Sequence, residues 1–164
     1  MDFKLGPHDS LVQLSTDWDF NTDGDAAELE SKMIQFMIDN RGIGLAANQI
    51  GLTKRVFVMG SYTIDGFPQP FALFNPVILE ESKEIVLDQE GCLSYPGLYL
   101  TVKRPAWVRV AYQNSKGDII EAKLTGYLSK CFQHELDHLN GVCFVDKVSS
   151  LKLKLAMKKL RKNK

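Results

Sequence analysis

The first strong periodic pattern along the chain is helical and covers residues 24–41, DGDAAELESKMIQFMIDN. Its apolar residues recur at intervals of three and four, as on one face of a helix: Leu29, Met33, Phe36 and Met37. Acidic residues are concentrated at the start of the segment, where they favour the helix dipole. Gly42 follows as a stop signal, so we expect a helix that ends at about this glycine.

Shorter apolar runs in the middle of the chain predict strands. Residues 55–59 (RVFVM) and 71–79 (FALFNPVIL) are rich in β-branched and aromatic residues, and glycine and prolines occupy the loop between them. Apolar and polar residues alternate only weakly over residues 98–103. The runs 107–113 and 118–124 flank the turn NSKG, which is typical of a β-hairpin.

Two further helices are predicted near the C-terminus. One covers about residues 127–140 and is stopped by Gly141, and the other covers residues 149–162, where leucines are spaced among lysines. A helix, several strands with a hairpin and two more helices indicate the α+β class.

Composition narrows the class of protein. The chain has 164 residues, 45% of them hydrophobic and 24% charged, which suits one globular domain. No apolar stretch approaches the roughly 20 residues of a membrane span, and the N-terminus does not resemble a secretory signal. Three cysteines provide no disulfide framework, so we expect a reducing, cytoplasmic compartment.

Charge is unevenly distributed although the formal net charge is zero. Residues 1–146 contain 12 basic and 20 acidic residues, a net −8, whereas the last 18 residues contain eight basic residues and no acidic one. Such a basic tail can meet a polyanion such as RNA. A solvated terminal helix explains the same pattern equally well.

The segment CFQHELDHLNG (131–141) contains two of the three histidines. On a helical wheel the helix divides into a histidine–glutamate sector, an apolar sector and a polar sector that includes Asp137. His134 and His138 are at positions i and i+4, so their imidazoles can converge on one metal ion, and Glu135 can reach a water molecule there. The alternative is a buried histidine pair without a metal.

A third ligand is needed, and the common protease completions are missing. Asp146 is the only acidic residue after Asp137, and Phe144 stands where a metzincin has its last histidine. Cys131 shares the helix face, but reaching it would stretch the ligands over about 10 Å of helix. Cys143 lies in the apolar run VCFV, which is more typical of a hydrophobic core than of a metal site. Cys92, in the turn-flanked EGCLSYPG, is favoured, and Cys143 stays open.

Three stretches together resemble, in order and spacing, the signature motifs of peptide deformylases: GIGLAANQ (42–49), EGCLS (90–94) and QHELDH (133–138). The resemblance covers roughly residues 24–150. It implies mixed or antiparallel sheets packed around a central metal-binding helix. We expect a deformylase-like catalytic domain over residues 1–150 and a basic C-terminal amphipathic helix or tail over residues 151–164.

The resemblance also implies roles for individual residues. One divalent ion, Fe(II) in the cell and replaceable by zinc, nickel or cobalt, would be bound by Cys92, His134 and His138. Glu135 would be the general base and acid. Gln49 and the backbone N–H of Leu93 would hold the developing oxyanion. The cleft would be lined by Gly42, Ile43 and Gly44, and the methionine pocket by Ile43, Tyr127 and Cys131.

The implied substrate is the N-formylmethionyl end of a new polypeptide, and the products are formate and a free N-terminus. The tail is compatible with a contact to the ribosome, and we expect neither DNA nor a membrane as partner. Two alternatives remain: a metallo-amidase of the same fold with another acyl substrate, and an inactive homologue that binds nascent chains or ribosomes. The second is disfavoured because every site residue is present.

Two details concern the surroundings of the site. Glu90 and Arg104 form either a buried brace behind Cys92 or an exposed surface pair. Tyr99 stands about where many bacterial deformylases have an arginine that contacts substrate. The resemblance therefore does not indicate which residue here contacts the peptide backbone. The N-terminal segment HDSLVQLS resembles the family's N-terminal pattern only weakly.

Overall fold

The computed structural model describes residues 2–162. Met1 of the predicted catalytic domain and residues 163–164 of the predicted tail lie outside this range. The chain folds into a five-stranded sheet, a two-stranded sheet and helices, which confirms the α+β class. No helix within the described residues combines the length and the apolar character needed to cross a membrane.

The larger sheet is antiparallel throughout and has the order β1-β2-β3-β6-β7. Its strands are Gly44–Ala46, Val56–Met59, Phe71–Glu81, Trp107–Gln113 and Ile119–Thr125. The predicted hairpin is confirmed, with Gln113 opposite Ile119 across the turn. Pro76 is tolerated within β3 because Asn75 adopts a positive φ of 51° and the register with β6 shifts there.

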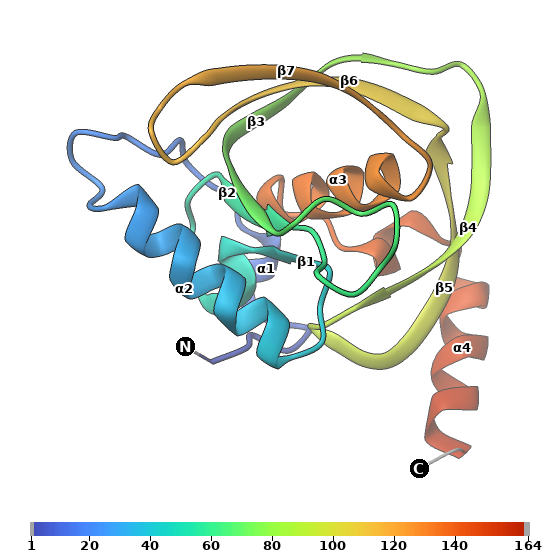
Figure 1. The fold of residues 1–164 in the computed structure, drawn as a ribbon. Coiled ribbons are helices and arrows are strands. Elements are labelled where there is room, and N and C mark those ends of the chain that lie inside the picture. Colours follow the sequence, from blue (N-terminus) through green and yellow to red (C-terminus); the bar gives the residue numbers. More distant parts are fainter. Residues whose placement is uncertain (1, 163–164) are drawn as a thin grey trace.

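The two-stranded sheet consists of β4 (Ile85–Cys92) and β5 (Tyr95–Pro105). The weak alternation over 98–103 therefore marked the middle of a longer strand. β4 was missed altogether. Figure 1 shows this pair at the side of the molecule, with β3 and the β6–β7 hairpin arching over α3 (Gly126–Leu139).

Two apolar clusters fill the two faces of the large sheet. On one face, Val56, Val58 and Phe74 pack with Met33 and Met37 of α2 (Ala26–Asp39). On the other face, the alternate residues pack with α3, and this cluster includes Phe57, Met59, Leu73, Phe132 and Leu139. Alternate residues of each strand thus pack on opposite faces of the sheet, so both faces are buried. The packing on the second face holds α3 in the centre of the molecule.

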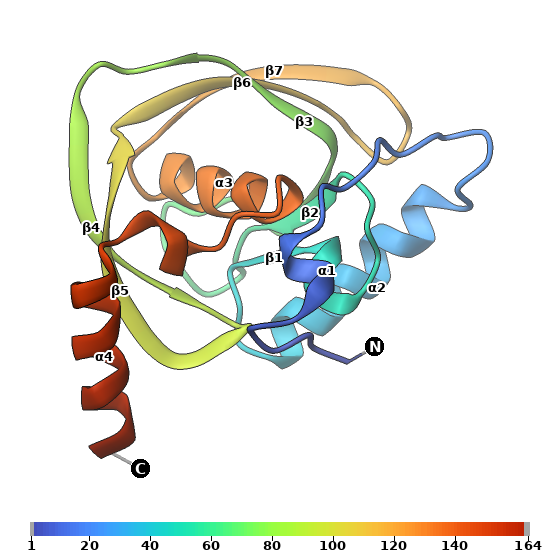
Figure 2. The same cartoon turned by 180° about the vertical axis from the view of Figure 1, so that it is seen from behind.

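The predicted first helix is confirmed, with Asp25 as its N-cap accepting a hydrogen bond from the N–H of Glu28. Its expected stop at Gly42 is corrected, because Arg41 rather than the glycine takes the left-handed conformation, at φ 57°. Figure 2 shows the short helix α1 (Asp9–Val12) beside the 3-10 helix Ala47–Ile50, where the Ser10 hydroxyl donates to the carbonyl oxygen of Asn48.

The C-terminal segment forms α4 (Ser150–Lys162), as the leucine spacing predicted. Its apolar side packs on a third cluster, formed by alternate residues of β5 and by Phe144 of the 3-10 helix Phe144–Lys147. The packed residues of α4 are Leu153, Ala156, Met157 and Leu160. The tail is therefore attached along one face and leaves its lysine-rich face exposed.

Candidate active site

Three side chains from two elements converge beneath the arch of strands. His134 and His138 project from α3, and Cys92 is the last residue of β4. One ligand atom from each of the three lies within 4.8 Å of the others. The Sγ of Cys92 is 3.3 Å from Nε2 of His138, and the two imidazole rings are 5.0 Å apart between centroids. The structure therefore brings Cys92, and neither other cysteine, to the histidine pair.

The donor set fits a single metal ion. A thiolate and two imidazoles are ligands for zinc and for other first-row transition metals. His134 binds Glu90 through Nδ1, which leaves Nε2 as its ligand atom. Burial would lower the pKa of His134, but Cys92 and Glu90 raise it to about 10. A proton and a metal ion therefore compete for one lone pair.

The remaining cysteines lie elsewhere. Cys131 is buried on α3 with its Sγ 3.6 Å from the carbonyl oxygen of Ile43, and burial raises its pKa well above the ordinary value. Cys143 is buried at the start of the 3-10 helix, where burial raises its pKa to about 11. Burial thus keeps both thiols protonated at neutral pH, and among the described residues the group of converging ligand atoms contains Cys92 and neither of these two.

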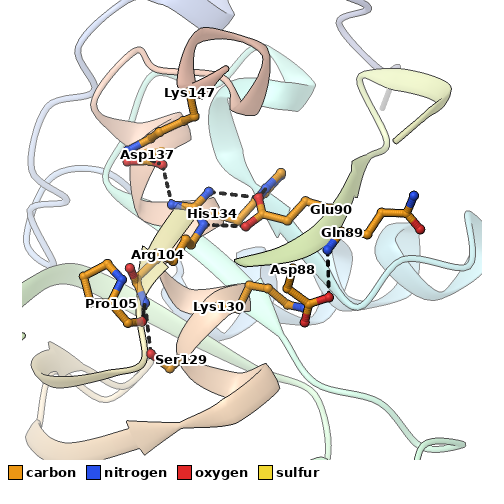
Figure 3. A network of polar contacts seen from close by, with 11 residues as sticks. Asp88, Gln89, Glu90, Arg104, Pro105, Ser129, Lys130, His134, Asp137 and Lys147 are labelled. Carbon is orange, nitrogen blue, oxygen red and sulfur yellow. Dashed lines mark hydrogen bonds and ion pairs between the residues drawn. The ribbon is translucent and has the colours of Figure 1, made fainter. Parts of the chain in front are cut away.

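A buried brace holds His134 in place, which decides between the two readings of Glu90 and Arg104. The Arg104 guanidinium donates two hydrogen bonds to the Glu90 carboxylate, and both side chains are only 4% exposed. Figure 3 shows Arg104 between Glu90 and Asp137, with Lys147 on the far side of Asp137. Burial alone would raise the pKa of Glu90, but Arg104 and His134 outweigh it and lower the pKa to about 2. The carboxylate is thus held ionised against the imidazole.

Glu135 points to the same site from the next position on α3. It is 4% exposed, and its Oε2 is buried without a hydrogen-bond partner among the described residues. Burial raises its pKa to about 7. Gly44 makes room for it, because a Cβ at that position would lie 2.3 Å from Oε1 of Glu135.

Gln49 is buried, and hydrogen bonds fix its side-chain amide. Its Oε1 accepts a hydrogen bond from the backbone N–H of Ala46 at 2.9 Å, so the Nε2 must face the site. That Nε2 is 3.5 Å from the Sγ of Cys92 and donates to the Ser94 hydroxyl at 3.1 Å. Ser94 was not singled out from the sequence, although it ends the motif EGCLS.

A cleft of about 530 Å³ leads to these groups. Both predicted oxyanion donors and the glycine segment line it: Gly42, Ile43, Gly44, Gln49 and Leu93. A small cavity of about 60 Å³ opens beside it, and its wall includes the three residues expected at a methionine pocket, Ile43, Tyr127 and Cys131. The structure thus brings every predicted site residue to one place.

The sequence did not indicate two residues that contact Tyr127 in the wall of this cavity. Lys130 lines it as well, forms an ion pair with Asp88 and lies 4.0 Å above the ring of Tyr127 (Figure 3 shows Lys130 and Asp88). Phe67, from the loop before β3, packs edge-on against Tyr127. The polar sector of α3 is therefore not a solvent face, and Ser129 and Gln133 are buried too.

Comparisons with known proteins agree on one family. The family model described as Polypeptide deformylase matches residues 3–154. Peptide deformylase 1 of Nostoc sp. is 45% identical over 128 residues, which cover 78% of this chain and 68% of the relative.

Solved structures give the same result. A Synechococcus elongatus peptide deformylase in complex with actinonin has a TM-score of 0.87 and 36% identity, covering 98% of this chain and 85% of that one. A Met-Ala-Ser-bound deformylase of Acinetobacter baumannii has a TM-score of 0.83 and 30% identity, covering 90% and 98%.

Proposed function

The chain belongs to the polypeptide deformylase family and is a hydrolase that removes the N-formyl group from new polypeptides, and we propose that the residues converging beneath the arch carry out this reaction. The observation that carries the proposal is the placement of Glu135 beside the Cys92–His134–His138 set, on one cleft. The substrate is the N-formylmethionyl end of a nascent chain. The products are formate and a free amino terminus.

Cys92, His134 and His138 would hold one divalent ion. When bound, the ion supplies a Lewis acid that makes water a better nucleophile and polarises the formyl carbonyl. A soft thiolate ligand suits iron as well as zinc. We propose Fe(II) as the ion in the cell, with zinc, nickel or cobalt as substitutes. A reduced Cys92 and ferrous iron both fit the cytosol.

Glu135 moves the proton. Its carboxylate takes a proton from the attacking water and later delivers it to the departing amine nitrogen as the C–N bond breaks. A pKa of about 7 suits both steps at neutral pH, because the group can accept the proton and release it again. Gly44 supports this role, because any side chain there would displace the carboxylate.

Gln49 and Leu93 supply the donors for the oxyanion. The Gln49 amide is oriented by its bond to Ala46, so its Nε2 already points towards Cys92, where negative charge would develop on the formyl oxygen. One such preorganised donor is typically worth about 3 kcal/mol. Leu93 follows Cys92 directly, which puts its backbone N–H next to the metal ligand.

The substrate chain would lie along β1. This strand is the edge of the five-stranded sheet, and Gly42, Ile43 and Gly44 line the cleft. An extended peptide can add to such an edge by backbone hydrogen bonds. Ile43, Tyr127 and Cys131 would then surround the methionine side chain in the small cavity.

We also propose that the exposed face of α4 contacts the ribosome. Leu151 and Leu155 are exposed there among the lysines, while the other apolar residues of the helix pack on β5. The exposed basic residues of α4 would meet phosphate groups of RNA.

The test of the activity is release of formate from formyl-Met-Ala-Ser by protein prepared without oxygen and loaded with iron. We expect turnover that depends on the metal. Turnover of acetyl-Met-Ala-Ser instead would show a different acyl specificity, and no turnover of any N-acyl peptide would contradict the proposed reaction.

A further inference from the structure

The cleft does not end at the metal ligands. Besides the small cavity at Tyr127, a second cavity of about 240 Å³ adjoins the cleft. It shares three lining residues with the cleft, Gly97, Leu98 and Tyr99. Its other side is formed by α4, including Lys159. The two cavities are therefore neighbours across the segment 97–99, and the C-terminal helix forms one wall of the extension.

Tyr99 lies where the two cavities meet. It is opposite Gly91 in the β4–β5 register, and a Cβ at Gly91 would lie 2.7 Å from Cε1 of Tyr99. The ring thus rests on Gly91, the residue before Cys92, while 61% of Tyr99 is exposed. Its outer face can support a peptide that passes from the metal site towards α4.

Lys159 is held at this place by the packing of its helix. The neighbouring Leu160 packs in the β5 cluster, and its Cδ1 lies 3.1 Å from the position of a Cβ on Gly97. Within residues 2–162, Lys159 forms no ion pair. None of the described residues that line the second cavity is acidic. A cation in a groove whose described lining contains no acidic side chain favours an anionic ligand.

We propose that this second cavity binds a carboxylate of the formylated peptide, downstream of its methionine. The proposal rests on the deformylase reaction and adds a preference for acidic residues beyond the third position. An extended peptide advances about 3.3 Å per residue, so residues beyond the third would lie further along the cleft. The proposal directs them past Tyr99, which lines both cavities, to Lys159.

The test compares three peptide amides: formyl-Met-Ala-Ser, formyl-Met-Ala-Ser-Ala-Asp-Asp and formyl-Met-Ala-Ser-Ala-Asn-Asn. The amide removes the terminal carboxylate, and the two longer peptides differ only in charge. For an exposed ion pair we expect a KM about two- to fivefold lower for the Asp-Asp peptide. Lys159→Ala should abolish this difference without changing the KM of the tripeptide, and Lys159→Glu should reverse it.

Lys154→Ala is the matched control, because Lys154 is on the same helix but lines a different cavity. We expect it to keep the preference. Equal KM values for the two longer peptides in the unchanged protein, or an equal loss in both alanine variants, would overturn the subsite while leaving the deformylase reaction intact. Absence of formate from all three peptides would overturn the reaction and the subsite together.

Discussion

The Nδ1 of His134 lies 2.9 Å from Oε2 of Glu90, and the same carboxylate accepts two hydrogen bonds from Arg104. A histidine of the proposed metal site is thus tied to a buried ion pair that reaches from β4 through β5 to α3. The orientation of its ligand atom depends on groups that never touch the ion.

Glu90→Gln should therefore weaken metal binding. It keeps the shape of the side chain but removes the charge that faces His134 and Arg104. We expect metal affinity to fall by about 10- to 100-fold. We expect the free energy of unfolding to fall by on the order of 3 kcal/mol, because Arg104 loses a buried partner. Competition with a chelator and urea unfolding measure the two effects.

The control for this variant is Glu80→Gln, which alters an exposed ion pair with Arg109. It should change neither quantity by much, since exposed pairs contribute about 1 kcal/mol or less. Unchanged metal affinity in Glu90→Gln would show that the brace serves the fold alone.

Replacing the three cysteines one at a time should distinguish the proposed metal ligand from the two cysteines that only pack in the interior. Cys92→Ala removes a converging ligand atom, so its metal affinity should fall by more than the roughly 100-fold seen at most for outer partners. Cys131→Ala and Cys143→Ala remove buried neutral thiols and should lower stability while keeping the metal. Equal losses of metal in all three variants would contradict the assignment of Cys92.

Glu135→Ala should keep the metal and lose the activity. The proposed role is proton transfer, and such groups typically contribute about 100- to 10,000-fold to the rate. Metal content is measured on the purified variant, and kcat by formate release from formyl-Met-Ala-Ser. Loss of the metal together with the activity would show instead that Glu135 is a ligand.

The sequence predicted the placement of the two proposed histidine ligands well because α3 presents a local pattern. His134, Glu135 and His138 depend only on helix geometry, which the periodicity fixes. The third ligand depends on a strand that was not predicted. Residues 85–89 of β4 are exposed on both faces of the two-stranded sheet, so they show no alternation of apolar and polar residues. Residue patterns alone therefore favoured Cys92 over Cys143 without deciding between them.

The polar sector of α3 illustrates a second limit. Gln133 and Ser129 look like surface residues on a helical wheel, yet both are buried. Gln133 donates to the Pro105 carbonyl oxygen at 3.0 Å and to the Ser129 hydroxyl at 2.9 Å. A polar residue can be buried wherever distant partners satisfy it, and those partners come from the tertiary fold.

The buried Glu135 should make the stability of the metal-free protein depend on pH. Its pKa rises from 4.5 to about 7 in the folded state, so the fold favours the protonated form. Between these values the folded state binds more protons than the unfolded state, and stability falls as pH rises. Each unit of pKa corresponds to about 1.4 kcal/mol, so the contribution lost approaches roughly 3 kcal/mol.

Glu135→Gln cannot ionise and should escape this loss. Urea unfolding of both chelator-treated proteins should show similar stabilities near pH 4.5 and a growing advantage of the variant up to pH 8. Contributions from titrating groups that do not interact with Glu135 largely cancel in the difference between the two proteins, whereas that of His134 does not, because the two side chains shift each other's pKa. A difference that does not change with pH would contradict the raised pKa.

The basic face of α4 should contribute to ribosome association without contributing to turnover of a short peptide. Deletion of the helix is a poor test, because Leu153 and Met157 cover the apolar side of β5. Changing Lys152, Lys158 and Lys162 to Glu keeps that packing and reverses exposed charge. We expect unchanged kcat/KM for formyl-Met-Ala-Ser, weaker binding to ribosomes, and a slope of log affinity against log salt concentration that is smaller by about two.

The matched control changes three exposed lysines elsewhere, Lys83, Lys103 and Lys116, to Glu. If both triple variants lose ribosome binding equally, net charge rather than this face of α4 is responsible, and if neither loses it, α4 is only a packed terminal helix.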